Sequence, residues 1–348
     1  MDKITIFAAV NTKIRVMERE FLKREDYLIL LKKKSVAEAS RYLKESTSYR
    51  KLLGEVYPDT VSRRDIEDIL KRNMIKNINK LIHYFRDDYK ILIRSLYMKY
   101  EIEDLKVLAR SIFNGKNPAA IEKSLTFIGR YSQVNPEKLI KSETIRDLIY
   151  SLEGSEFFEF LIPLIDGKRE NLFRFEMALD MGYFNIIQSR KLKISSKDRQ
   201  LLKKWEGMVA DLYNIQWIYR GKKFYNLSPE ELLNYTINFG DKLTFLDRKK
   251  MCYTKSMEEL FKITANSVYG FLFKVEEIST DIYMERRINR FIYYQLRVLS
   301  SKSPLSIIQT IEYVWLLEFE IRDIISIIES IRYNLPSEEA RKFLVKVA

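Results

Sequence analysis

The sequence contains no clustered set of residues of the kind that carries out nucleophilic or metal-assisted catalysis. The chain has one histidine, His83, and one cysteine, Cys252. Triads of the Ser-His-Asp or Cys-His kind would have to use His83, which lies in the helix-like stretch LIHYF at 81–85 and is expected to be a packing or partly exposed residue. Two lysines precede Cys252, but the favoured interpretation is a small apolar core residue. One cysteine and one histidine cannot form an internal disulfide or a Cys/His zinc site.

Phosphate-binding motifs are incomplete. Three Gly-Lys pairs, beginning at Gly115, Gly167 and Gly221, each lack the upstream glycine of a P-loop. All-helical enzymes that act on diphosphates hold magnesium with the pattern Asp-Asp-x-x-Asp. Here Asp87-Asp88 is followed by Tyr-Lys-Ile, so the third carboxylate is missing and a helix-end charge cluster is favoured. We therefore expect no catalytic residues, no cofactor and no metal.

One segment, 285–297 with the sequence ERRINRFIYYQLR, interleaves basic and aromatic residues as nucleic-acid binders do. On a helix, one side of this segment would be an inward stripe of Ile288, Phe291, Ile292, Gln295 and Leu296. The other side would be an outward basic ridge of Arg286, Arg290 and Arg297. A solvated face is the simplest interpretation. Docking of an acidic partner is the functional alternative, with nucleic acid less favoured because no RNA or DNA module accompanies the ridge.

The elements that position these residues are expected to be long helices. The chain has 348 residues, of which 46% are hydrophobic, with only 10 Gly and 7 Pro. This composition excludes disorder and argues against a turn-rich β sandwich. Near the C-terminus, apolar residues recur at steps of three and four, which predicts one buried helix stripe: Val314, Leu317, Ile321, Ile324, Ile325, Ile328 and Ile331. The predicted fold class is all-α.

The net charge of +13 suggests an acidic partner, which could be nucleic acid, anionic lipid or an acidic protein surface. Charged residues follow the short apolar stretch at 1–10 too soon for a signal peptide. The sequence has no run of about 18 uncharged apolar residues of the kind that spans a membrane. We expect neither a signal peptide nor a transmembrane segment.

A five-residue station recurs at a nearly constant interval of about 110 residues, and a fixed period of this kind indicates a repeated structural unit. The pattern of the station is acidic, apolar, any, Asp or Asn, apolar, and it begins at Glu101, Asp211 and Glu320. The fourth positions of the three stations are Asp104, Asn214 and Asp323.

Other positions recur in the same order. Tyr49, Phe158 and Tyr269 are each followed by Leu three residues later. Lys-Ser pairs ending at Ser35, Ser142 and Ser256 are expected to open the helix before each aromatic residue.

Downstream of the stations, three dipeptides predict a new helix start: Asn-Pro at 117–118, Ser-Pro at 228–229 and Pro-Ser at 336–337. Ser228 with Glu231 fits a capping box. The period is too long for a solenoid repeat, so each copy is expected to be a small helical domain. The predicted domains are 1–121, 122–232 and 233–348.

The C-terminal segments YVWLLEFEIRDI at 313–324 and IRYNLP at 331–336 resemble the signature of the C subunit of archaeal and bacterial V/A-type rotary ATPases, which corresponds to the d subunit of eukaryotic V-type enzymes. VNTKIRV at 10–16, the segment 42–49 and YEIEDL at 100–105 are also similar to that family. The resemblance covers essentially the whole chain and is loosest in the middle copy.

The resemblance implies three similar helical domains around a pseudo-threefold axis, forming a funnel. It implies a non-catalytic central-stalk subunit that couples shaft subunits of the D and F type to the membrane rotor ring, for ATP-linked proton or sodium translocation. Such a subunit is peripheral to the cytoplasmic face of the membrane and needs no nucleic acid. The resemblance implies no catalytic or metal-binding residues in this sequence. Arg110 and Arg220 share a register with Glu329, so no common role is implied for that position.

Two other functions remain open on the residues alone. One is a helical protein-interaction scaffold, and the other, less favoured, is a basic RNA-binding helical protein.

Overall fold

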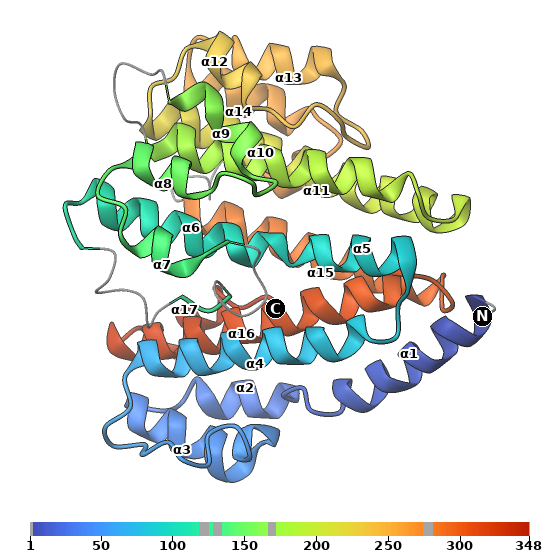
Figure 1. Cartoon of the computed structure of the whole chain (residues 1–348). Helices are drawn as coiled ribbons and strands as arrows, with labels where there is room; N and C mark the ends of the chain where they lie inside the picture. Colours follow the sequence, from blue (N-terminus) through green and yellow to red (C-terminus); the bar gives the residue numbers. More distant parts are fainter. Residues whose placement is uncertain (1–2, 118–124, 128–133, 166–171, 274–280, 348) are drawn as a thin grey trace. The chain divides into compact units, whose positions relative to one another are not determined.

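The computed structural model describes all residues except 1–2, 118–124, 128–133, 166–171, 274–280 and 348 (Figure 1). Every regular element in the described residues is a helix, which confirms the predicted all-α class. The helices form two compact units. We call Phe85–Ile194 the contiguous unit, and Met1–Tyr84 together with Ser195–Ala348 the two-segment unit.

The contiguous unit contains α5 (Asp87–Leu96), α6 (Met98–Phe113), α7 (Pro136–Ile140), α8 (Ile145–Ser151), α9 (Phe158–Leu161), the 3-10 turn η3 (Ile162–Leu164) and α10 (Leu172–Lys191). In this unit α10 packs along α5 and α6, and α8 packs on α6. Ile102, Leu105 and Leu108 of α6 are buried in one core with Leu148 of α8 and Phe175 of α10. One face of α6 is therefore buried in the core of this unit.

The two-segment unit begins with α1 (Lys3–Glu18), α2 (Arg24–Leu30), α3 (Val36–Ser46), η1 (Ser48–Arg50) and α4 (Arg63–Ile82). Its later elements are α11 (Ser196–Phe224), α12 (Pro229–Asn234), α13 (Phe245–Cys252), α14 (Met257–Ala265), η4 (Gly270–Leu272), α15 (Asp281–Ser301), α16 (Ile308–Arg332) and α17 (Ser337–Arg341). The two longest helices organise the packing of this unit. One of them, α11, packs against α12 to α15, and the other, α16, packs against α15, α1, α3 and α4.

The helices repeat with the period seen in the sequence. The helices α4, α10 and α15 begin at residues 63, 172 and 281. The helices that carry the stations end at residues 113, 224 and 332. In the first copy the station helix is divided into α5 and α6, whereas α11 runs without a break. The triplication is therefore a property of the secondary structure as well as of the sequence.

Helix starts follow the predicted caps in two of three copies. The hydroxyls of Ser35 and Ser256 accept N–H groups at the starts of α3 and α14. In the middle copy the prediction of Ser142 was wrong, because Thr144 caps α8 and accepts the Asp147 N–H at 3.0 Å. Thr144 is a better match, since it lies one repeat period after Ser35 and has an acidic residue three positions later to complete a capping box.

The downstream helix starts are also confirmed where they are described. Ser228 accepts the Glu231 N–H at 3.1 Å at the start of α12, and Pro336 is the N-cap of α17. Pro118, in the first copy, lies outside the described residues.

Within the two-segment unit, α11 and α16 run in the same direction and in matching register (Figure 1). Near their starts, Asp198 Oδ1 accepts the Ile307 N–H at 3.2 Å. Further along, the rings of Trp205 and Trp315 meet edge to face with centroids 5.5 Å apart. Both contacts join positions separated by one repeat period, so equivalent parts of the repeat face each other.

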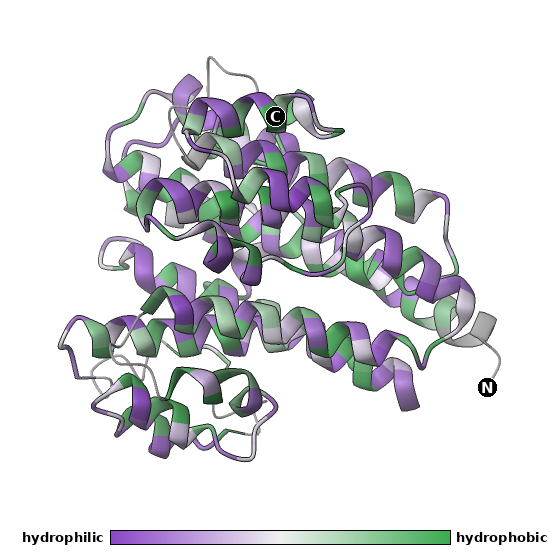
Figure 2. Cartoon of the chain, turned by 90° about the horizontal axis from the view of Figure 1, so that it is seen from above, coloured by the Kyte–Doolittle hydropathy of each residue, from purple (hydrophilic) through white to green (hydrophobic). Residues whose placement is uncertain are grey.

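Polar residues recur along the long helices, as Figure 2 shows by their hydropathy colours. Among the described residues, no helix combines the length and apolar character needed to cross a membrane. On α15, Ile288, Ile292 and Leu296 are buried as predicted. Gln295 is exposed, so its place in the inward stripe was wrong.

Candidate functional site

The fourth residue of each station holds the backbone of a later segment of the chain. Asp104 accepts the Thr126 N–H at 3.0 Å and the Phe127 N–H at 2.7 Å. Asp323 accepts the N–H groups of Val345 and Lys346, each at 2.8 Å. In both copies the bound groups lie 22 and 23 residues after the aspartate.

In the middle copy the side-chain amide of Asn214 binds the backbone of the later segment. Asn214 Oδ1 accepts the Ile237 N–H at 2.7 Å, and its Nδ2 donates to the Ile237 carbonyl at 3.0 Å. All three fourth-position side chains are buried, and each satisfies backbone groups that would otherwise lack partners. This equivalent bonding supports a common origin for the three copies.

The first residue of a station binds a second set of groups. Asp211 Oδ2 accepts three successive N–H groups, those of residues 241 to 243, and the Tyr269 hydroxyl at 2.9 Å. Glu320 accepts the Leu22 N–H at 3.0 Å and the Tyr49 hydroxyl at 2.8 Å.

Lys346 Nζ also donates to Glu320, at 2.7 Å. Residues from near both ends of the chain therefore meet on this carboxylate, which is fully buried. Glu101, the corresponding residue of the first copy, is also buried.

These hydrogen bonds join residues that belong to different predicted copies. Tyr269, placed in the third copy, binds Asp211 of the second, and Tyr49 of the first copy binds Glu320 of the third. In the two-segment unit, the station of the second copy therefore binds the tyrosine of the third copy, and the station of the third copy binds the tyrosine of the first. The boundaries predicted at 121 and 232 stay a prediction.

Burial raises the pKa of several groups at the stations and of their partners. Burial raises the pKa of Asp323 to about 6, although the Lys346 and Val345 N–H groups favour its ionised form. Burial also raises the pKa of Asp211. Burial and the Glu320 carboxylate raise the pKa of Tyr49 well above its usual value, so this phenol stays a neutral donor. The stations work as structural acceptors.

A second repeated contact joins the station helices to their neighbours. Arg110 of α6 forms a two-pronged pair with Glu176 of α10, at 2.7 and 3.0 Å. Arg220 of α11 reaches Glu285 of α15 at 3.4 Å.

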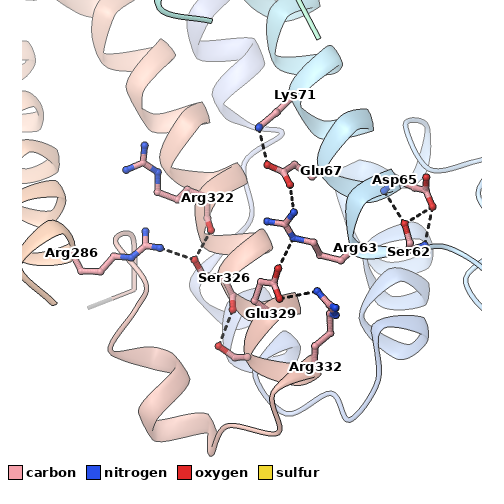
Figure 3. Close-up of polar contacts among 11 residues, drawn as sticks. Ser62, Arg63, Asp65, Glu67, Lys71, Arg286, Arg322, Ser326, Glu329 and Arg332 are labelled. Atoms are coloured by element: carbon pink, nitrogen blue, oxygen red, sulfur yellow. Dashed lines mark hydrogen bonds and ion pairs between the residues drawn. The ribbon is translucent and has the colours of Figure 1, made fainter. Parts of the chain in front are cut away.

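In the third copy the station helix carries the acidic residue of this ion pair, and the neighbouring helix carries the arginine. Glu329 of α16 pairs with Arg63 of α4 at 2.8 Å, and Arg63 also pairs with Glu67 (Figure 3). Glu67, Glu176 and Glu285 recur at the repeat period, so Arg63 supplies the cation that the station helix itself carries in the other copies. This role of Arg63 was not predicted. The regular spacing of the three glutamates was the signal that could have revealed it.

The predicted ridge on α15 is largely engaged within the chain. Arg286 Nη2 donates to Ser326 Oγ at 3.0 Å, as Figure 3 shows, and Arg290 Nε donates to the Leu344 carbonyl at 2.8 Å. Both side chains are half-buried, which differs from the predicted outward ridge. Arg297 is exposed and pairs with Glu312 at 3.0 Å. A docking role for these arginines stays a prediction.

The remaining candidates lie apart from one another in the chain and occupy structural positions. Cys252 is buried, and burial raises the pKa of its thiol to about 12, which confirms a core residue. His83 is the exposed C-cap of α4. Asp87 and Asp88 open α5, as expected for a helix-end charge cluster. In the described part of the chain, no three His, Cys, Asp or Glu side chains are grouped to hold a metal ion.

Comparison with known proteins connects this geometry to a family. The family model described as ATP synthase (C/AC39) subunit matches residues 10–343. The chain belongs to this family. The resemblance found in the sequence is thereby confirmed, and with it the relation to A-type ATPases.

Relatives of this C/AC39 chain are named as the C subunit of the A-type ATP synthase. The Methanocaldococcus jannaschii protein is 22% identical over 98% of this chain and 86% of its own length. The Archaeoglobus fulgidus protein is 24% identical over 97% of this chain and 96% of its own length. The Methanosarcina mazei protein is 24% identical over 88% and 84%, respectively. In each of these comparisons the similarity covers at least 84% of both proteins.

Proposed function

We propose that this chain is the non-catalytic central-stalk subunit of an A-type ATP synthase, joining the shaft subunits to the membrane rotor ring. The observation that carries the proposal is the match of residues 10–343 to the C/AC39 family. The full-length likeness to proteins named as the C subunit of the A-type ATP synthase agrees with it. In this role the chain is peripheral to the cytoplasmic face of the membrane and works as three helical domains in a funnel.

The internal bonding suits a part that transmits torque. A coupling element must resist twisting, and buried polar bonds that are fully satisfied hold helices in one arrangement. Glu320 accepts such bonds at both carboxylate oxygens, from the Leu22 N–H, the Tyr49 hydroxyl and Lys346, which are distant from one another in the sequence. Interhelical pairs such as Arg110–Glu176 add fixed geometry at the helix surfaces.

Loss of coupling is the test of this role. Membranes from cells that lack the chain are expected to keep ATP hydrolysis in the catalytic subunits but to lose ATP-driven ion pumping. Re-expression of the wild-type chain serves as the control and should restore pumping. Pumping at the wild-type rate without the chain would refute the proposal.

A further inference from the structure

Each station helix ends in an exposed aromatic side chain. Phe113 is the last residue of α6 and is 52% exposed, and Phe224 is the last residue of α11 and is 56% exposed. Tyr333, the C-cap of α16, is 72% exposed. Single exposed aromatic residues are ordinary on protein surfaces. The same feature at the same place in three copies calls for a common cause.

Helix termination does not require these rings. Each helix is closed by backbone bonds of the Schellman kind, in which an N–H beyond the helix reaches back to a carbonyl in its last turn. The Lys116 N–H reaches the Ser111 carbonyl at 2.9 Å, and the Leu335 N–H reaches the Ser330 carbonyl at 2.9 Å. The Leu227 N–H reaches the Gly221 carbonyl at 3.2 Å. The left-handed turns are made by Gly115, Asn226 and Asn334.

Two of the three ends project from the same side of the two-segment unit. Since α11 and α16 run parallel and in register, their C-terminal ends, with Phe224 and Tyr333, lie on one side of the pair (Figure 1). Phe113 holds the equivalent position in the contiguous unit.

Basic side chains accompany each ring. Lys223 Nζ lies 5.3 Å from the Phe224 ring centroid, and Arg332 immediately precedes Tyr333. Lys116, three residues after Phe113, is exposed. Exposed aromatic residues with adjacent cations are typical of contact points for acidic protein surfaces.

We infer that Phe113, Phe224 and Tyr333 are contact points for a ring of identical subunits whose loops carry acidic side chains. This inference rests on the proposed function. A ring offers the same loop repeatedly, so one residue type can serve in all three copies of the chain. A central shaft without rotational repetition gives no reason to keep one feature in three copies.

The test is a pull-down of the tagged full-length chain from detergent-solubilised membranes, with ring and shaft subunits quantified separately. The test variant combines Phe113→Ala, Phe224→Ala and Tyr333→Ala. The matched control combines Tyr57→Ala, Tyr150→Ala and Phe245→Ala, which remove equally exposed aromatic residues away from the ends of the station helices. Thermal melting by circular dichroism checks the fold of both proteins.

We expect the test variant to lose ring subunits by about tenfold or more, while shaft recovery stays at the wild-type level. The control should keep both. Full recovery of the ring, loss of the shaft instead, or equal loss of both in a variant that melts like wild type would overturn the inference alone. If the wild-type chain recovers neither partner, the proposed function fails as well.

Discussion

At the residue scale, the fourth station position shows which chemistry the fold needs. Asp104 and Asp323 accept two backbone N–H groups each, whereas Asn214 accepts one N–H and donates to one carbonyl. An acidic group is thus required only where two donors converge. The sequence pattern "Asp or Asn" reflects the polarity of the backbone groups that each copy presents.

The two donors on Asp323 lead to a prediction for Asp323→Asn. An amide offers one acceptor oxygen, so one of the N–H groups of Val345 and Lys346 loses its partner. We expect a loss of about 1–2 kcal/mol in the free energy of unfolding at pH 7, measured by urea denaturation.

The same variant should change the pH dependence of stability. Burial raises the folded-state pKa of Asp323 to about 6 from 3.8, so between these values the folded state holds a proton that the unfolded state has released. Asp323 therefore makes wild-type stability fall as pH rises from about 4 to about 6, and its contribution is constant above that range. Asp323→Asn should remove this contribution, whereas Asp59→Asn, at a side chain 75% exposed, should not. Identical pH profiles for wild type and Asp323→Asn would contradict the assignment.

At the scale of helices, each station helix is joined to a neighbouring long helix by an ion pair. The station helix carries the cation at Arg110 and Arg220 but the anion at Glu329, and Arg63 provides the opposite charge from α4. The ion pair is maintained although the arginine and the glutamate have exchanged helices. Similarity in the sequence alone could not show this, because the compensating residue lies on another helix.

A rescue experiment tests the shared role. Glu329→Arg should lower the free energy of unfolding by about 1 kcal/mol, because the new guanidinium faces Arg63 and Arg332 in a partly exposed site. Adding Arg63→Ala should recover most of this loss. The guanidinium at position 329 can then pair with Glu67, in the way that Arg110 pairs with Glu176.

Thermal melting of both single variants and the double variant gives the coupling energy between the two sites. A double variant less stable than Glu329→Arg alone would show that the third copy does not use the same contact.

At the scale of the whole chain, the structure divides the molecule differently from the period. The core around α6 contains residues from α8 and α10 and lies entirely within Phe85–Ile194. A cut at residue 121 would separate α6 from these partners. The core therefore favours 85–194 as a folding unit, whereas the period predicts boundaries at 121 and 232.

Two fragments distinguish these alternatives. The fragment 85–194 should fold alone into a helical protein with a cooperative melting transition, since its core residues are all retained. The fragment 122–232 should not, because α10 loses the Ile102, Leu105 and Leu108 face of α6. Circular dichroism and hydrogen exchange measure both. A cooperative 122–232 fragment with a disordered 85–194 fragment would instead favour the boundaries given by the period.

Spacing along the chain was enough to predict the all-α class and the threefold repetition, whereas the family was inferred from the resemblance of segments such as 313–324. The class and the repetition depend on local intervals: apolar steps of three and four residues fix helix faces, and station residues such as Glu320 and Asp323 have counterparts at a constant interval. Of the five predicted helix starts within the described residues, four are confirmed, since a cap depends on residues only three positions apart.

Long-range packing, by contrast, determines which partners those residues bind. Tyr49 and Glu320 are 271 residues apart, and no local pattern links them. The same holds for Arg63 with Glu329, and for the half-burial of Arg286 and Arg290 against α16 and the C-terminal segment. Helix periodicity assigns a residue to a face, but the neighbouring element decides whether that face meets water or another helix.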